Sequence, residues 1–156
     1  VGDSLGNTVL GLPDTVGVTL DMMLHHSAAV ARAKTEALVV GDLPFGSYQA
    51  SPEQAVASAI RLVKDGGAHC VKLEGGRKRV PMIEALVDAE IPVMGHIGLT
   101  PQSVHQMGGF KVQRDEERLL KDARDVQAAG NTQDVLGGFA DTDVDAFTPG
   151  CASDCR

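Results

Sequence analysis

The chain has 156 residues, enough for one domain with an apolar core. A formal net charge of −7 excludes nonspecific nucleic-acid binding, which needs clustered Lys and Arg. No apolar run approaches the roughly 18 residues of a membrane span, so no membrane partner is expected. Three Cys without the spacing of a complete zinc site fit a reduced, cytoplasmic protein. The sequence opens on Val within a strand-like segment, from which we expect an amino-terminal truncation.

Strand-like and helical segments alternate along the chain, which predicts an α/β fold with a parallel sheet. A first strand ends near Asp3. The clearest helix start is Ser51, because Pro52 suits the first helical position and Gln54 completes an S-x-x-Q capping box. Helices are predicted over about 19–34, 51–65, 80–89, 100–106 and 115–129, and further strands over about 37–40, 69–73 and 91–94.

The pattern changes after Gly130, so that residues 1–130 form the predicted folded domain. Residues 131–156 are rich in Gly and Asp and have no sustained period, with Val135-Leu136 as the one hint of a strand. We expect this divergent tail to be poorly ordered, because it buries too little apolar surface to offset the entropy of ordering.

Charged side chains follow or end the successive apolar runs, each close to Gly or Pro. They are Asp3, Asp42, Lys72 with Glu74, and His96. Because the carboxyl ends of parallel strands meet at one edge of a sheet, this placement predicts a shared polar site. Two carboxylates at such ends indicate a hard divalent cation.

Each of these residues also has an ordinary structural interpretation. Asp3 and Asp42 are equally compatible with turn chemistry. Lys72 and Glu74 point to the same face of one strand and would form an exposed pair if that face met solvent. His96 alone would more often be structural than catalytic.

Two other features leave alternatives open. Phe45 and Tyr48 either line the mouth of a pocket or pack in the core. The segment T-P-Q-S at 100–103 is best explained as helix capping, with any cofactor contact secondary.

Six motifs in register carry a resemblance to a known family. They read V-G-D-S-L-G (1–6), V-T-L-D-M-M (18–23), D-L-P-F-G-S-Y (42–48), V-K-L-E-G-G (71–76), G-H-I-G-L-T-P-Q-S-V (95–104) and G-G-F-K-V-Q (108–113). Over about residues 1–130 the chain resembles ketopantoate hydroxymethyltransferase. The resemblance implies a partial (βα)₈ TIM barrel, with about four parallel strands and flanking helices, truncated at both ends, since a complete barrel takes roughly 250 residues.

The resemblance also implies an activity. Family enzymes use Mg²⁺ and 5,10-methylenetetrahydrofolate to transfer a one-carbon unit to 3-methyl-2-oxobutanoate, in pantothenate biosynthesis. The product is ketopantoate, formed through a Mg-stabilised enolate of the oxoacid. Family members form homo-oligomers, which we expect for the intact enzyme.

Site residues follow from the same resemblance. It implies that Asp3 and Asp42 bind the metal and, through it, the substrate, while Glu74 stands behind them or on a metal-bound water. Ser4 and Lys72 would hold the substrate carboxylate, and His96 would lie beside the bound oxoacid, with Lys72 and His96 as the catalytic side chains.

The chain also departs from the family pattern. After Gln113 it has Arg114, with one Gly missing, and it has no Glu after Glu117, although the family carries a Glu general base further along. We therefore expect weak or no turnover by this chain alone. Two other hypotheses remain open: a Mg-dependent 2-oxo acid lyase of the phosphoenolpyruvate mutase and isocitrate lyase group, and a non-catalytic fragment that associates with intact subunits.

Overall fold

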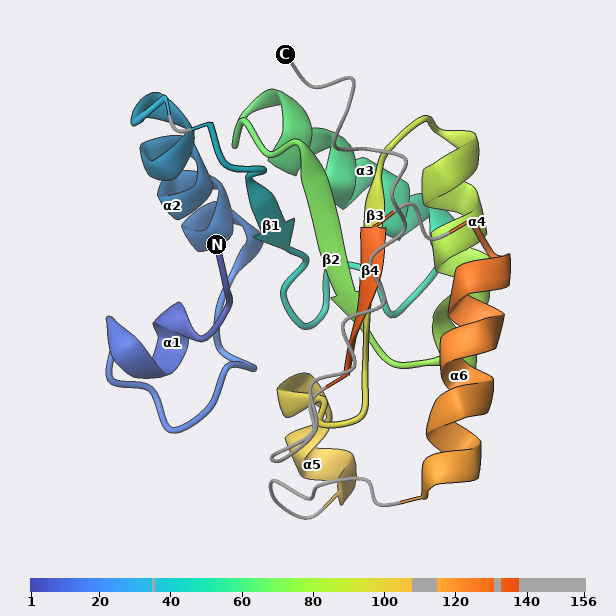
Figure 1. The fold of residues 1–156 in the computed structure, drawn as a ribbon. Helices are drawn as coiled ribbons and strands as arrows, with labels where there is room; N and C mark the ends of the chain where they lie inside the picture. Colours follow the sequence, from blue (N-terminus) through green and yellow to red (C-terminus); the bar gives the residue numbers. More distant parts are fainter. Residues whose placement is uncertain (35, 108–114, 131–132, 138–156) are drawn as a thin grey trace.

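Four parallel strands form one sheet whose order follows the chain, β1-β2-β3-β4 (Figure 1). This computed structural model describes residues 1–34, 36–107, 115–130 and 133–137. The strands are β1 (Val40–Asp42), β2 (Cys70–Glu74), β3 (Val93–Ile97) and β4 (Gln133–Gly137). Parallel neighbours joined by helical connections confirm the predicted α/β class.

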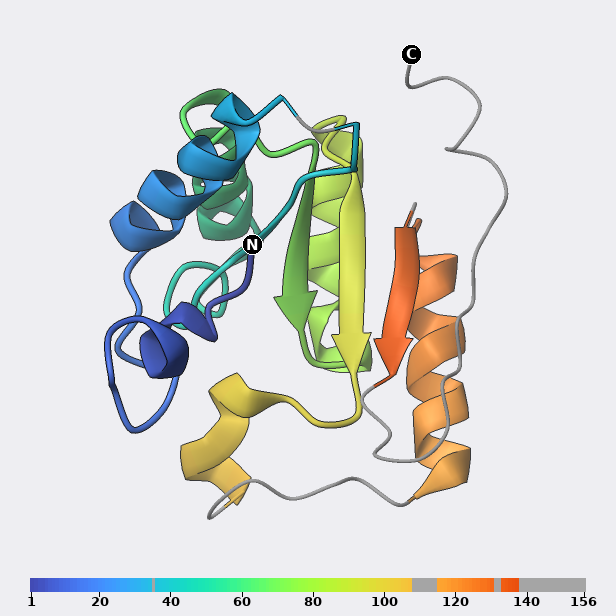
Figure 2. The same cartoon turned by 60° about the vertical axis from the view of Figure 1, so that its left-hand side comes forward.

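Helices cover one side of this sheet (Figures 1 and 2). The long helices are α2 (Leu20–Arg32), α3 (Pro52–Lys64), α4 (Val80–Asp88) and α6 (Glu116–Ala128). The short ones are α1 (Leu5–Thr8), α5 (Val104–Met107) and the 3₁₀ turns η1 (Arg77–Arg79) and η2 (Pro101–Ser103). Contacts of α2 with α3, α3 with α4, and α4 with α6 show that the helices follow one another in strand order.

The apolar core lies between the helices and the sheet. Val71 and Leu73 of β2 are fully buried there, together with Leu62 of α3 and Ile83 and Leu86 of α4. Full burial of such a side chain contributes about 1.5–3 kcal/mol. Since side chains alternate along a strand, Lys72 and Glu74 face the other side of the sheet, away from this core.

Two strands are displaced from their predicted positions. The predicted strand 37–40 becomes β1 at Val40–Asp42, and the predicted strand 91–94 becomes β3 at Val93–Ile97. The cause is the pairing, because β1 meets β2 from Val40 opposite Cys70 to Asp42 opposite Lys72. Apolar runs locate a buried segment, but strand bounds are set by the ladder of the neighbour.

The first residues of the chain extend the sheet beyond β1. The amino group of Val1 donates to the Val40 carbonyl at 2.6 Å, and the Asp42 N–H donates to the Val1 carbonyl at 3.1 Å. These bonds seat Val1 beside β1 and bring the following Asp3 to the end of that strand. The expected first strand is thus a short extended segment.

The starts of α2 and α3 match the sequence prediction. Thr19 Oγ1 accepts from the Met22 N–H, and Ser51 Oγ accepts from the Gln54 N–H, each at 3.2 Å. Gln54 Oε1 reaches back to the N–H of Ala50 at 3.1 Å, one residue before the cap. Both caps satisfy N–H groups that the helices leave free.

Two glycines shape the turn that leaves β2. Gly75 has a φ of +110°, which favours glycine, and its N–H donates to the His96 carbonyl at 2.8 Å. A Cβ on Gly76 would overlap the carboxylate of Asp122 in α6. The Gly-Gly pair thus lets α6 approach the loop directly behind Glu74.

The segment after Gly130 is described only in part. The backbone of Gln133–Gly137 forms β4, where the sequence offered Val135-Leu136 as its single sign of a strand. The rest of the predicted tail, with Cys151 and Cys155, and the whole G-G-F-K-V-Q motif lie outside the described residues. None of the described helices is long and apolar enough to cross a membrane.

Candidate functional site

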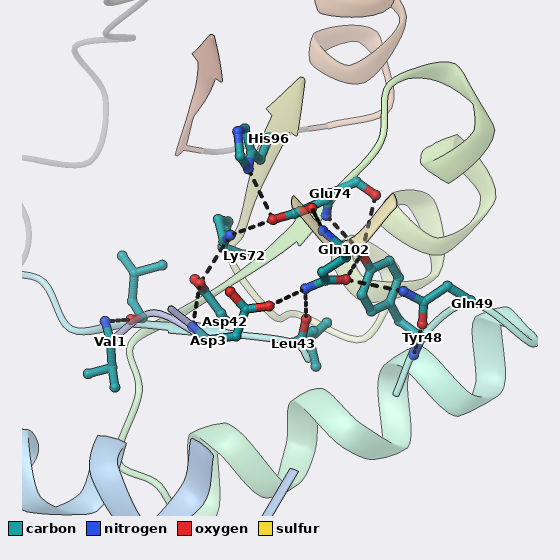
Figure 3. A network of polar contacts seen from close by, with 11 residues as sticks. Val1, Asp3, Asp42, Leu43, Tyr48, Gln49, Lys72, Glu74, His96 and Gln102 are labelled. Carbon is teal, nitrogen blue, oxygen red and sulfur yellow. Dashed lines mark hydrogen bonds and ion pairs between the residues drawn. The ribbon is translucent and has the colours of Figure 1, made fainter. Parts of the chain in front are cut away.

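Charged residues of three strands meet on the face of the sheet opposite the core (Figure 3). Asp42 is the register partner of Lys72, and Glu74 is the register partner of His96. Asp3 joins them, because its N–H donates to Asp42 Oδ2 at 3.1 Å. The sequence prediction that these five residues gather at the strand ends is therefore realised in the structure.

Lys72 links two of the acids. Its Nζ lies 3.0 Å from Asp42 Oδ2 and 3.5 Å from Glu74 Oε1, and the Lys72 side chain is only 9% exposed. Burial alone would lower the pKa of Lys72, but the carboxylates of Asp42 and Glu74 outweigh it and hold this pKa above its ordinary value. The ammonium is therefore charged at neutral pH, and the interpretation of an exposed pair is wrong.

Asp3 is the acid of the site whose buried carboxylate is least stabilised by its neighbours. It is 4% exposed, and its Oδ2 accepts from Gln102 Nε2 at 2.8 Å. Burial raises the pKa of Asp3; the Gln102 hydrogen bond and Lys72 oppose the rise, while Asp42 and Glu74 add to it. Ionisation of this carboxylate therefore costs free energy in the folded chain, and a nearby positive charge would reduce that cost.

Glu74 lies between Lys72 and His96. His96 Nδ1 is 3.4 Å from Glu74 Oε1, a contact without hydrogen-bond alignment, and that buried nitrogen has no hydrogen-bond partner among the described residues. Burial alone would raise the pKa of Glu74, but the interactions with His96 and Lys72 and the N–H of Gln102 lower it. Glu74 is therefore ionised at neutral pH.

Gln102 and Tyr48 complete the network, although no motif in the sequence predicted either as a site residue. Gln102 is 4% exposed, and its N–H donates to Glu74 Oε2 at 3.0 Å. The Tyr48 hydroxyl donates to Gln102 Oε1 at 2.6 Å and accepts from the Glu74 N–H at 3.1 Å. Tyr48 is 1% exposed, so it belongs to the interior and not to a pocket mouth.

The structure also shows where Ser4, the segment 100–103 and Phe45 lie relative to this cluster. Ser4 is exposed, and its hydroxyl makes no hydrogen bond within the described part of the chain. The Thr100 side chain forms no cap, so T-P-Q-S serves mainly to turn Gln102 inward. Phe45 is 45% exposed and lines, with Leu20 and Pro44, a separate open hollow of about 290 Å³ that includes none of the charged residues.

The two aspartates fit a magnesium ion by their chemistry. Together with Glu74, Asp3 and Asp42 set three buried carboxylates against the single ammonium of Lys72, which leaves an excess of negative charge. Mg²⁺ is usually held by one or two carboxylates and keeps several waters. Among the described residues no group of three or more Asp, Glu, His and Cys side chains could hold an ion. The ion would therefore be held by the carboxylates of Asp3 and Asp42, because both oxygens of Glu74 already contact other groups of the site.

This is the arrangement of α/β proteins that hold a ligand at the carboxyl ends of parallel strands. A sequence model of the ketopantoate hydroxymethyltransferase family matches residues 1–142, further than the expected limit near Gly130. The chain therefore belongs to the ketopantoate hydroxymethyltransferase family.

Several curated relatives carry the name 3-methyl-2-oxobutanoate hydroxymethyltransferase. That of Desulforapulum autotrophicum is 59% identical over 139 residues, which cover 89% of this chain and 53% of the relative. That of Thermobifida fusca is 60% identical over 140 residues, covering 87% of this chain and 50% of the relative. That of Syntrophomonas wolfei is 56% identical over 134 residues, covering 83% and 49%. The chain spans about half the length of the curated relatives it matches.

Proposed function

We propose that this chain carries the cation-binding and oxoacid-binding part of a hydroxymethyltransferase centre. The reaction transfers a one-carbon unit from 5,10-methylenetetrahydrofolate to 3-methyl-2-oxobutanoate and gives ketopantoate for pantothenate biosynthesis. The observation that carries the proposal is the buried cluster of Asp3, Asp42 and Glu74 around Lys72, in a chain of this family. In this proposal the sheet and its helices are part of a (βα)₈ barrel.

Asp3 and Asp42 would hold the Mg²⁺ ion. Their backbone link, from the Asp3 N–H to Asp42 Oδ2, keeps the two carboxyl groups together in the absence of an ion. When bound, the ion would polarise the carbonyl of a 2-oxo acid and so acidify the neighbouring C–H bond. Glu74 would act behind these ligands, since both of its oxygens already contact other groups of the site.

Lys72 would bind the carboxylate of the oxoacid. Its ammonium already faces carboxylate oxygen, and its raised pKa keeps it charged. Glu74 holds the ammonium from the other side and fixes its direction. Ser4, next to Asp3 and free to turn, would supply a hydroxyl donor to the same substrate group, and His96 would line the pocket beside the oxoacid.

The cellular location and the oligomeric state belong to the same proposal. The buried thiol of Cys70 fits a reduced, cytoplasmic protein, and assembly into homo-oligomers would follow the family. The 2-oxo acid lyase hypothesis is the less favoured one, because the relatives that the chain matches carry the hydroxymethyltransferase name.

Calorimetric titration of the purified chain with 3-methyl-2-oxobutanoate tests the proposal. We expect saturable binding that requires Mg²⁺, is lost in Asp42→Asn, and is retained in Lys64→Met, which alters an exposed lysine of α3. Under the same conditions 3-methylbutanoate, which lacks the 2-oxo group, should not bind. Binding without Mg²⁺, or no binding by a folded chain, would contradict the assignment.

A further inference from the structure

The Gln102 side chain uses every hydrogen-bonding position that it has. Its Nε2 donates to Asp3 Oδ2 at 2.8 Å and to the Leu43 carbonyl at 3.0 Å. Its Oε1 accepts from the Tyr48 hydroxyl at 2.6 Å and from Gln49 Nε2 at 3.2 Å. A primary amide has two N–H donors and two acceptor sites, so all four are satisfied.

These partners allow only one orientation of the amide. Rotation by half a turn would set Oε1 against the Asp3 carboxylate and the Leu43 carbonyl, where acceptor would face acceptor. It would also set Nε2 against the donor group of Gln49. The Tyr48 hydroxyl has one proton to donate, and its 2.6 Å contact with Gln102 Oε1 is shorter than its 3.2 Å contact with the Glu74 carbonyl. The contacts of Oε1 with Tyr48 and Gln49 therefore fix the end of the amide that lies away from Asp3.

The same residue connects distant parts of the chain at the site. Through Gln102, the turn before α1, the loop after β1 and the end of β2 share one buried network (Figure 3). Its side chain holds Asp3 Oδ2, and its backbone N–H holds Glu74 Oε2. In the described structure no hydrogen bond engages Asp3 Oδ1.

We propose that Gln102 is a positioning residue that fixes Asp3 and Glu74 so that one oxygen of Asp3 remains directed to a cation. The role toward the cation rests on the proposed function, whereas the fixed amide does not. A hydrogen bond behind a metal-binding carboxylate restricts its rotation, so less entropy is lost when the ion binds.

The first experiment measures binding of Mn²⁺ alone to the full chain by electron paramagnetic resonance. Gln102→Met keeps the length of the side chain and removes the amide, and we expect its Mn²⁺ affinity to fall about 10- to 100-fold. Tyr48→Phe keeps the buried ring and removes the hydroxyl, which holds Oε1 and also accepts from the Glu74 N–H, and a smaller loss is expected. The matched control is Gln106→Met, at an exposed position of α5, which should bind like the wild type.

Thermal unfolding shows whether each variant is folded before its affinity is compared. Folded Gln102→Met that binds Mn²⁺ within twofold of the wild type would overturn the proposal. If Gln102→Met does not fold, Tyr48→Phe decides by the same criterion.

The second experiment needs no cation. In ¹⁵N spectra of the metal-free chain, the side-chain amide protons of Gln102 should exchange with water far more slowly than those of Gln106. The Gln102 signals should also shift in Asp3→Asn. Exchange as fast as that of Gln106 would overturn the fixed amide. A wild-type chain that binds no Mn²⁺ contradicts the proposed function, and the spectra then decide alone whether Gln102 positions Asp3.

Discussion

Lys72 Nζ lies 3.0 Å from Asp42 Oδ2, across the register pair that joins β2 to β1. Both side chains are almost fully buried, so the pair is screened little by solvent. Two further carboxylates, those of Asp3 and Glu74, belong to the same cluster. The stability of this end of the sheet and its proposed chemistry therefore depend on one ammonium group.

Lys72→Met should be strongly destabilising. It leaves the buried carboxylates of Asp42 and Glu74 without their cation, and loss of one partner of a buried pair costs roughly 3–5 kcal/mol. Urea unfolding in the absence of Mg²⁺ measures the difference. The control is Lys64→Met, at an exposed position, for which we expect a change within about 0.5 kcal/mol. A loss no larger than that of the control would contradict a buried ion pair.

Asp3→Asn should stabilise the chain at neutral pH when no divalent cation is present. The folded state raises the pKa of Asp3 above the ordinary 3.8, so wild-type stability is lost as the pH rises from that value through the folded pKa. Asn does not ionise, so its advantage should grow over the same interval and then level off. Unfolding curves collected with a chelator from acid to neutral pH give this difference.

Added Mg²⁺ should make the wild type more stable than Asp3→Asn. The wild type should gain stability through binding at Asp3 and Asp42, whereas Asp3→Asn should gain little. An Asp3→Asn variant that is less stable than the wild type in chelator would show that Asp3 is already compensated.

Ser51→Ala tests a local feature that both sequence and structure show. The Ser51 hydroxyl accepts the Gln54 N–H at the start of α3, and loss of such a cap typically costs about 1 kcal/mol. Ser51→Asp supplies another capping oxygen and should restore most of the loss in urea unfolding. Equal stability of Ser51→Ala and the wild type would mean that Pro52 and the packing of α3 determine this helix start without the cap.

The period of two along β2 was enough to predict that Lys72 and Glu74 share a face. The sequence could not show that Asp42 opposes Lys72 or that Glu74 opposes His96, because register follows from the backbone ladder. β1 illustrates this, since its apolar run lies at 37–40 while its pairing extends to Asp42.

Gln102 was missed for a different reason. Thr, Pro and Ser around it form an ordinary helix-start pattern, so a capping role explained the segment. Its partners Asp3, Leu43 and Tyr48 are 99, 59 and 54 residues away in the chain, beyond any local pattern. The available signal was a long amide in the short turn that follows β3, a strand that ends in the site.

Turnover by the purified chain should be weak and should depend on folate. The sequence has no Glu after Glu117, and a missing general base commonly lowers the rate by about 10²–10⁴. The assay follows ketopantoate formed from 3-methyl-2-oxobutanoate with and without 5,10-methylenetetrahydrofolate. A rate near that of a full-length relative would contradict the expected weakness. Cleavage of the oxoacid without folate would favour the lyase hypothesis.

The location of the cation tests most directly whether Asp3 and Asp42 form the metal site. A crystal of the chain grown with Mn²⁺ and 3-methyl-2-oxobutanoate should show one anomalous scattering peak in contact with the carboxylates of Asp3 and Asp42. The oxoacid carboxylate should lie against Lys72, with the Asp3–Gln102 hydrogen bond unchanged. Crystals in which the peak lies elsewhere, or in which the oxoacid binds without contact to either aspartate, would contradict a metal site at Asp3 and Asp42.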